Sequence, residues 1–147
     1  MQLKTILNRG TCYKSFVFGK VTWVENSETP AIEVEVRPRR NGRRICSGCE
    51  RVCPGYDTMP EPRRFEFVPR WGITVYFLYC MRRVNCPRCG VKVELVPWAE
   101  GKSTITTEYK WFLARWAKRM SWKEVSEAFH ISWDKVYEAV KYAVSWG

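Results

Sequence analysis

The sequence predicts an α+β protein: an N-terminal β-hairpin and a zinc-ribbon-like β region, followed by a bundle of three helices. Two observations support this prediction. Residues 15–96 contain several short apolar or alternating segments around two C-x-x-C motifs. Residues 106–144 instead repeat apolar residues at intervals of three and four, which is the spacing of one face of a helix.

Length and composition limit the possible classes of protein. The chain has 147 residues, which suits one domain or two small ones. Because 46% of the residues are hydrophobic and 15% are aromatic, the chain can form a core and is not expected to be disordered. No apolar run approaches the ~20 residues of a membrane span, and the N-terminus lacks the apolar stretch of a signal peptide. We therefore expect a cytoplasmic protein without a membrane partner.

The positive charge is concentrated in one segment. The net charge is +10, and residues 37–92 supply nine of these charges, with twelve arginines and one lysine against four acidic residues. Arginine makes bidentate contacts with phosphate and guanine, so this excess favours a nucleic acid partner over a basic face that is merely solvated. The arginines expected to hold phosphates or enter the minor groove are Arg39, Arg40, Arg43, Arg44, Arg82, Arg83 and Arg88.

Residues 1–36 are predicted to form a β-hairpin lead-in. Residues 15–24 and 31–37 have the composition of strands, and the turn residues 26–30 (Asn-Ser-Glu-Thr-Pro) lie between them. In the second segment apolar residues alternate with charged ones, as in a half-buried strand. Two strands alone are marginally stable in water, so this hairpin needs a packing partner.

The two C-x-x-C motifs predict a metal site in a zinc-binding β domain over residues 37–100. They are separated by the 36 residues 50–85. Paired motifs of this kind supply four thiolates for tetrahedral Zn²⁺, so the expected structural zinc ligands are Cys46, Cys49, Cys86 and Cys89. Four thiolates leave no open coordination position, so the metal is expected to hold the fold and not to catalyse hydrolysis. Further strands are expected at residues 64–68, 73–84 and 91–96, as in a zinc ribbon with a long insert.

Disulfides and a redox pair are the alternatives to zinc. Disulfides suit secreted chains, and a redox C-x-x-C motif does not explain a second copy. Within the zinc interpretation, Cys53 follows Cys49 closely and stays open as an alternative ligand. Cys12 and Cys80 have no partner at ligand spacing and are expected to be small, wholly or partly buried side chains. Gly48 and Gly90 are expected to let the backbone curl toward the sulfur atoms.

Residues 101–147 are predicted to form a helix-turn-helix domain. A leading helix is capped by Thr106 or Thr107, and the capping box Ser121–Glu124 opens a short second helix. A turn at His130 leads to a third helix capped by Ser132. Glycine is common at this turn, and histidine tolerates a left-handed backbone better than most residues.

The third helix is the expected recognition helix. The residues near the N-terminus of such a helix read bases, so Trp133, Lys135 and Tyr137 are the first candidates, with Ser132 and Lys141 beside them. The alternative is a three-helix packing module that mediates protein contacts.

Several motifs run in one order from the cysteines to the last helix. They are Cys46-x-x-Cys49, Tyr56-Asp57, Arg82-Arg83-Val84-x-Cys86-Pro87-x-Cys89-Gly90, Val96-Pro97-Trp98-Ala99, Thr106-Thr107 and Phe129-His130-Ile131-Ser132-Trp133-x-x-Val136. In this order they resemble the head of the ISL-three type of insertion-sequence transposases. The resemblance covers about residues 40–147. Before that point only the hairpin and the arginine-rich lead-in are similar.

The resemblance implies a DNA-binding part of a transposase. In that family the zinc ribbon and helix-turn-helix bind the terminal inverted repeats of the element in double-stranded DNA, and the protein acts on the prokaryotic nucleoid. A following magnesium-dependent DDE domain cuts and joins DNA. Asp57 and Asp134 are the only aspartates of this chain, and neither lies in a setting like the catalytic strands of the family. We therefore expect no catalytic residue and no enzyme activity in this chain.

Other functions remain open on the sequence alone. A stand-alone zinc-ribbon/helix-turn-helix regulator would recognise an operator. A dimerisation or protein-interaction module would self-associate, as a homodimer for example, and bind DNA weakly. A natural truncation could also compete with a full-length transposase for element ends.

Overall fold

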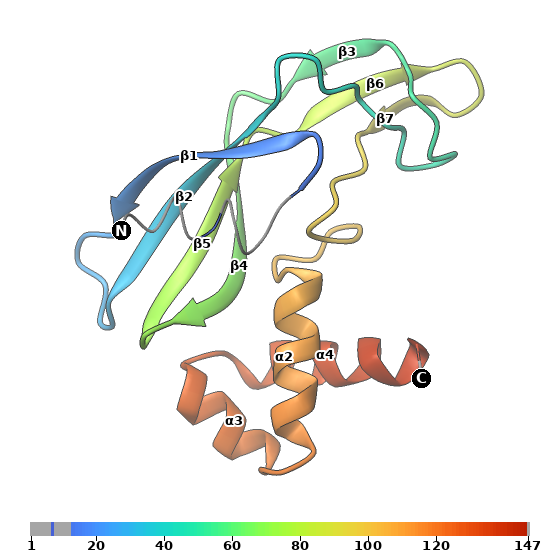
Figure 1. The fold of residues 1–147 in the computed structure, drawn as a ribbon. Helices are drawn as coiled ribbons and strands as arrows, with labels where there is room; N and C mark the ends of the chain where they lie inside the picture. The colour runs from blue at the N-terminus through green and yellow to red at the C-terminus, as the bar shows by residue number, and fades with distance from the viewer. Residues whose placement is uncertain (1–6, 8–12, 147) are drawn as a thin grey trace.

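Residues 13–146 form two β-sheets followed by three helices, which confirms the predicted α+β class (Figure 1). The computed structural model describes residue 7 and residues 13–146. The strands are β1 (Phe16–Trp23), β2 (Ala31–Pro38), β3 (Gly55–Thr58), β4 (Arg63–Arg70), β5 (Ile73–Tyr79), β6 (Arg82–Cys86) and β7 (Gly90–Val93). The helices are α2 (Thr107–Ala117), α3 (Trp122–Phe129) and α4 (Trp133–Trp146).

The larger sheet has four strands in the order β1-β2-β5-β4. The hairpins β1–β2 and β4–β5 are antiparallel, and β2 pairs with β5 in parallel, with Val34 opposite Phe77. The predicted lead-in hairpin therefore finds its packing partner in the second hairpin. The domain boundary predicted at residue 36 falls inside β2, because the two hairpins share one sheet and one core.

The core of the larger sheet is aromatic and centres on Trp98. This side chain is buried, and its ring lies edge-on to those of Phe16 and Tyr79, with centroids 4.9 and 5.1 Å away. Alternation along the strands places apolar residues on this face and charged ones on the other. Other buried members of this core are Phe18, Val34, Phe65, Phe67, Val75 and Phe77.

The smaller sheet has the order β3-β6-β7 and lies at the end of the molecule far from the helices (Figure 1). The sequence predicted one strand over residues 73–84, and this is wrong: β5 ends at Tyr79, and the chain enters the smaller sheet as β6. Apolar residues continue across the break, so the pattern does not mark the change of sheet. Strand β3 is short and exposed and was not predicted.

All three predicted helices are present, with the predicted caps. The side chain of Thr106 accepts a hydrogen bond from the Tyr109 amide at 3.2 Å. Both bonds of the capping box between Ser121 and Glu124 are formed, each at 3.1 Å. Ser132 Oγ accepts a longer bond from the Lys135 amide at 3.4 Å. None of the helices in the described residues has the length and apolar character needed to cross a membrane.

The three helices pack around their own apolar core. His130 ends α3 in the left-handed conformation with φ 51°, as the sequence predicts for this turn. The buried residues of this core are Ile105, Tyr109, Leu113, Val125, Ile131, Val136 and Ala139. A helix-turn-helix is expected to bury residues at positions 125, 129, 131 and 136; Val125, Ile131 and Val136 are buried, and Phe129 is partly buried against them.

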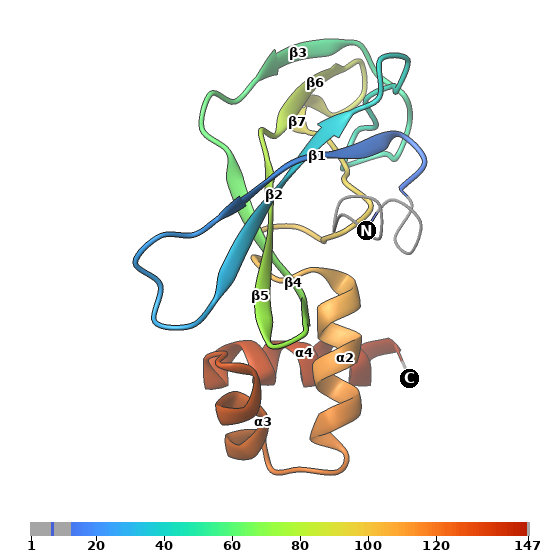
Figure 2. The ribbon, with the colours of Figure 1, turned by 60° about the vertical axis from the view of Figure 1, so that its left-hand side comes forward.

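Strand β4 fixes the helices to the larger sheet (Figure 2). The backbone of Glu66 bonds to Thr104 and Thr106 at the start of α2, at 2.7 and 2.9 Å. Its carboxylate accepts a hydrogen bond from Lys135 Nζ of α4 at 3.1 Å. Val68 packs against both cores. The helix-turn-helix is therefore held in one orientation on the sheet.

Candidate metal centre and nucleic-acid interface

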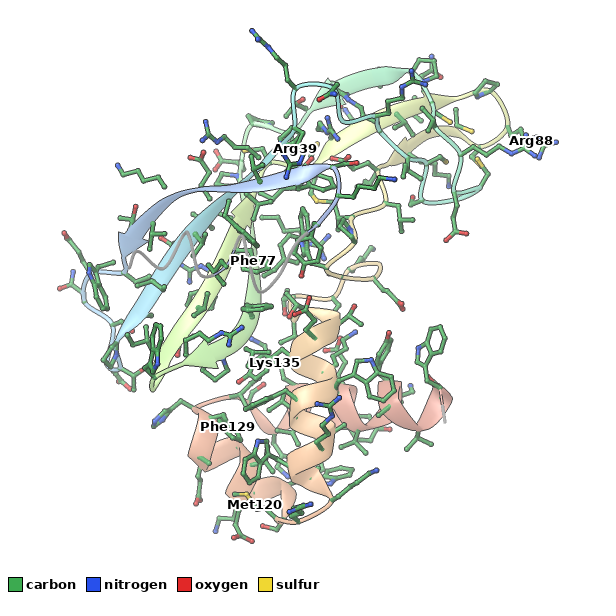
Figure 3. The ribbon with its side chains drawn as sticks, in the orientation of Figure 1. Arg39, Phe77, Arg88, Met120, Phe129 and Lys135 are labelled. Atoms are coloured by element: carbon green, nitrogen blue, oxygen red, sulfur yellow. The ribbon has the colours of Figure 1, made fainter. Side chains whose placement is uncertain are left out.

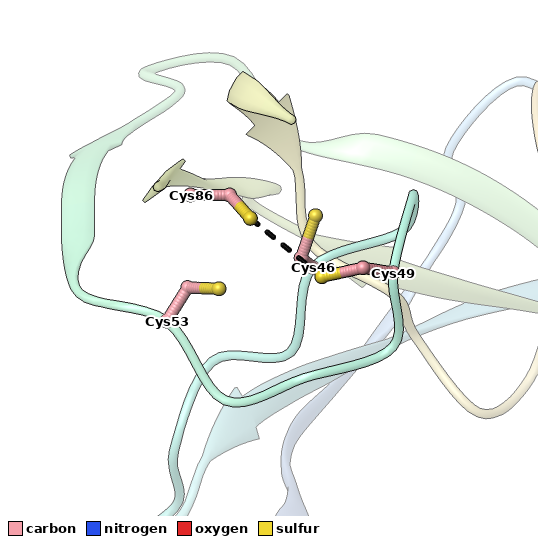
Figure 4. A group of neighbouring side chains, drawn as sticks. All are labelled: Cys46, Cys49, Cys53 and Cys86. Carbon is pink, nitrogen blue, oxygen red and sulfur yellow. Dashed lines mark hydrogen bonds between the residues drawn. The ribbon is translucent and has the colours of Figure 1, made fainter. Parts of the chain in front are cut away.

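Cysteine thiols converge beside the smaller sheet. The sulfur atoms of Cys46, Cys49, Cys53 and Cys86 all lie within 4.8 Å of one another (Figure 4). The sulfur atoms of Cys49 and Cys86 are 3.6 Å apart. Such a group of thiols could hold a metal ion.

Cys89 lies against the same cluster. Its thiol is in hydrogen-bonding contact with those of Cys46, Cys49 and Cys86, and burial raises its pKa to about 12. A Cβ atom added at Gly48 would lie 2.9 Å from the Cys89 sulfur. Glycine at this position therefore leaves the space that the sulfur occupies. Five thiols thus converge, one more than a tetrahedral ion binds.

The two C-x-x-C turns have the same local geometry. In the first, the Cys46 sulfur accepts a bond from the Gly48 amide at 3.3 Å, and a bond from the Cys49 amide contributes most to lowering its pKa. In the second, the Cys89 amide makes the matching bond and lowers the pKa of Cys86 to about 6. Amide donors favour the thiolate form, which is the form that binds a metal ion.

The backbone after each turn is also alike. Glu50 and Gly90 each follow the second cysteine of a turn, and both adopt positive φ, 59° and 79°. Cys53 belongs to neither turn, and burial raises its pKa to about 11. The four thiols that all lie within 4.8 Å of one another thus include Cys53, and Cys89 lies against them from the second turn. The six cysteines in the described residues are free, and Cys12 lies outside those residues.

Four of the arginines expected to contact DNA are exposed near this centre. Arg39 and Arg88 lie at the end of the molecule that carries the smaller sheet (Figure 3). The exposed members of the expected set are Arg39, Arg40, Arg43 and Arg88. Their guanidinium groups are accessible to phosphate.

The other three arginines are engaged within the protein. Arg82 is buried and bound by Glu94, with Nη2 2.8 Å from Oε2 and Nε 2.9 Å from Oε1. The expectation that Arg82 holds phosphate is therefore wrong, because its guanidinium neutralises a buried carboxylate. Arg83 Nε donates to Asp57 at 2.7 Å, and Arg44 donates to the carbonyl oxygens of Asp57 and Arg83 at 3.1 and 3.0 Å. Arg83 and Arg44 are only partly accessible.

The exposed start of α4 is aromatic. Trp133 and Tyr137 are about half exposed and stack with an interplanar angle of 7°. Trp122 of α3 packs beside both rings, with centroid distances of 5.1 and 5.9 Å. We call Trp122, Trp133 and Tyr137 the aromatic cluster. Ser132 and Lys141 are also exposed on α4.

Lys135 faces the larger sheet. Its Nζ binds the buried carboxylate of Glu66, so the structure does not leave this lysine free to read a base. The sequence could not reveal this pair, because Glu66 lies 69 residues earlier.

Basic residues at the end of α2 were missed as candidates. Arg115, Lys118 and Arg119 are exposed. Together with Phe112 and Trp116 they line a hollow on the surface. The signal was present in the sequence, as three basic residues within five positions.

Comparison with known proteins agrees with this geometry. Residues 94–144 match the helix-turn-helix domain of transposase family ISL3. Similar curated proteins are the transposases for insertion sequence element IS1557 from Mycobacterium tuberculosis, strains CDC 1551 / Oshkosh and ATCC 25618 / H37Rv. Each is 34% identical over 102 residues, which cover 69% of this chain and 23% of the relative. No solved structure matches the chain.

The fold and the match define a class of protein. A helix-turn-helix of this kind is a DNA-binding domain. More particularly, the chain contains a DNA-binding region of the ISL3 type of insertion-sequence transposase. It spans 23% of the length of the curated relatives that it matches.

Proposed function

We propose that this chain recognises the terminal inverted repeats of an insertion sequence and provides the DNA-binding part of a transposase. The observation that carries the proposal is the helix-turn-helix of α3 and α4, which the matched residues 94–144 cover except for the last two residues of α4. Helix α4 would lie in the major groove with Trp133, Tyr137 and Lys141 toward the bases.

The rest of the molecule supports this role by its charge and rigidity. The exposed arginines near the smaller sheet provide phosphate contacts, and the Glu66–Lys135 pair holds α4 at a fixed place relative to the sheet. The arginines near the smaller sheet and helix α4 would then contact the duplex at two places with a fixed separation. The DNA site is then longer than the few base pairs that one helix reads.

We further propose that the cysteine cluster binds a structural Zn²⁺ through Cys46, Cys49, Cys86 and Cys89. The residue after each C-x-x-C turn has a positive φ, and this likeness of the two turns supports their own four cysteines over a set that contains Cys53. The ion would join the loop before β3 to the β6–β7 hairpin. A site of four thiolates offers no position for substrate, so the ion's role is to hold the fold.

We place DNA cleavage outside this chain. Metal-dependent phosphoryl transfer needs several carboxylates that converge on the ions. Asp57 of β3 is paired with Arg83 of β6 within the smaller sheet, and Asp134 lies in the first turn of α4. The two aspartates therefore belong to separate parts of the fold.

Selection from a randomised pool of duplexes tests this function. The zinc-loaded chain is expected to enrich one motif, whose match to the ends of an insertion sequence identifies the element. Replacing Arg88 with Ala should weaken binding to all duplexes alike and lower the salt slope by about one unit. Arg64→Ala is the matched control, because this arginine binds Glu33 on the outer face of the larger sheet. An enriched operator outside any insertion sequence would instead indicate a regulator.

The aromatic cluster favours a second candidate function, a protein-interaction module. Exposed aromatic rings are typical of protein interfaces, and two copies of this chain could pair through them as a homodimer. Sedimentation equilibrium tests this candidate. A dimer with no affinity for DNA at moderate salt would support it and overturn the DNA-binding proposal.

A further inference from the structure

The turn between β4 and β5 carries a residue that its backbone disfavours. Arg70 pairs with Ile73, and the two residues between them, Trp71 and Gly72, have φ of 53° and 73°. Two successive positive φ values define a type I′ turn, whose first position is usually Asn, Asp or Gly. A bulky L-residue is strained there, so tryptophan is a poor choice for the turn itself.

Burial does not compensate for this strain. The Trp71 side chain is 73% exposed, so folding gains little from its apolar surface. A strained and exposed aromatic residue is therefore explained better by a contact with another molecule than by folding.

The turn lies beside the helix expected to read DNA. Strand β4 contacts α4 through Glu66 and Lys135, packs on the helical core through Val68, and reaches the turn two residues later. In Figure 1 the turn lies near the end of α3, from which the chain enters α4. A duplex with α4 in its major groove would pass the turn at an adjacent groove.

Charge identifies DNA as the partner of this turn. Arg70 forms no ion pair among the described residues, and its buried Nε has no hydrogen-bond partner there. The turn between β1 and β2 provides a contrast within the same sheet. It follows the exposed Trp23 and lies at the same end of the sheet, where the Thr74 amide donates to the Pro30 carbonyl at 3.0 Å, but it contains Glu25 and Glu28. Of these two turns, the β4–β5 turn alone combines an exposed ring with an arginine that has no acidic partner among the described residues.

We propose that Trp71 enters the minor groove of the bound DNA, next to the major-groove site of α4, and that Arg70 contacts the flanking phosphates. This inference rests on the proposed DNA-binding function. An aromatic side chain in the minor groove packs against the sugars or wedges between base pairs, and it favours flexible pyrimidine–purine steps. The recognised site would then extend beyond the bases that α4 reads.

The variant Trp71→Gly tests the inference without a loss of folding, because glycine suits the positive φ of this position. We expect its melting temperature to be unchanged or higher and its affinity for the selected duplex to fall about tenfold, the size of effect that losing an aromatic contact to a base produces. Trp71→Phe should recover most of the affinity. Trp23→Ala is the matched control and should bind like the unmodified chain.

Dimethyl sulfate protection locates the contact, since this reagent methylates guanine N7 in the major groove and adenine N3 in the minor groove. Trp71→Gly should lose protection of minor-groove adenines beside the site and keep protection of major-groove guanines. Equal affinity and equal protection for Trp71→Gly and the unmodified chain would overturn this inference alone. A chain that enriches no sequence and binds no duplex would overturn the proposed function together with it.

Discussion

The two ends of the molecule are held together in different ways. The helical end buries Leu113, Val125 and Val136 in an apolar core. The buried hydrophobic cluster at the smaller sheet consists of Cys46, Cys53, Val84 and Cys86, so only one of its members has a hydrocarbon side chain. A region this small cannot bury enough apolar surface to fold alone, and the thiols take the place of a core. The comparison teaches that one chain can stabilise its two ends by different chemistry.

Removal of the metal should therefore unfold the smaller sheet and leave the helices folded. This is the largest effect that we expect. Apparent binding free energies of structural zinc are about 10–16 kcal/mol at pH 7, and this free energy is lost on chelation or in Cys86→Ser. The smaller sheet should lose its order and the helices should remain, as measured by amide chemical shifts and by ellipticity at 222 nm. Cys80→Ser is the control, because Cys80 lies outside the thiol cluster. Equal loss of both ends would contradict the comparison.

A cavity in the helical core should have the opposite effect. Leu113 is fully buried, so Leu113→Ala should lower the free energy of unfolding by about 2–5 kcal/mol. The zinc content, measured by elemental analysis of the purified variant, should stay the same. If this variant loses zinc, the two ends are not independent in the way described.

The Glu66–Lys135 pair joins the helices to the larger sheet that lies between the two ends, and its removal sharpens the comparison. Glu66→Gln removes the charge of a buried carboxylate that binds a partly exposed lysine. We therefore expect a loss of about 1–2 kcal/mol in the free energy of unfolding. DNA affinity should fall further than this loss of stability implies, because α4 is no longer held in one orientation. Denaturant unfolding and a binding titration measure the two quantities. Arg37→Ala, which removes an exposed pair with Glu35, should change neither of them.

The smallest effect is expected at the capping box of α3. Ser121→Ala removes the acceptor for the Glu124 amide and should cost about 1 kcal/mol in the free energy of unfolding. Thermal unfolding followed at 222 nm measures it. A shift in the amide signals of the cysteine turns, which lie at the other end of the molecule, would be unexpected.

The sequence predicts the helices better than the sheets because their determinants are local. The caps at Thr106, Ser121 and Ser132 and the left-handed turn at His130 lie within a few residues of what they control. The parallel pairing of β2 with β5 has no such local signal, because strands pair across any distance in the chain.

In the candidate site, too, the features with local determinants are the ones that the sequence predicts. The cysteine motifs are visible as spacing, and the structure gathers their thiols. Arginine counts reveal the charge but not its partners. Arg82 and Lys135 were expected at DNA, and the structure pairs them with Glu94 and Glu66, which lie 12 and 69 residues away. Charged residues whose partners are distant in sequence cannot be assigned to a surface from the sequence alone.

The most direct test of the central claim is the ratio of two affinities. The zinc-loaded chain should bind its selected duplex at least about 10³-fold more tightly than a scrambled duplex at physiological salt, as sequence-specific DNA-binding proteins do. The same titration on both duplexes across a salt series separates phosphate contacts from base reading. A ratio near one at every salt concentration would contradict the account, because the chain would then bind DNA through charge alone.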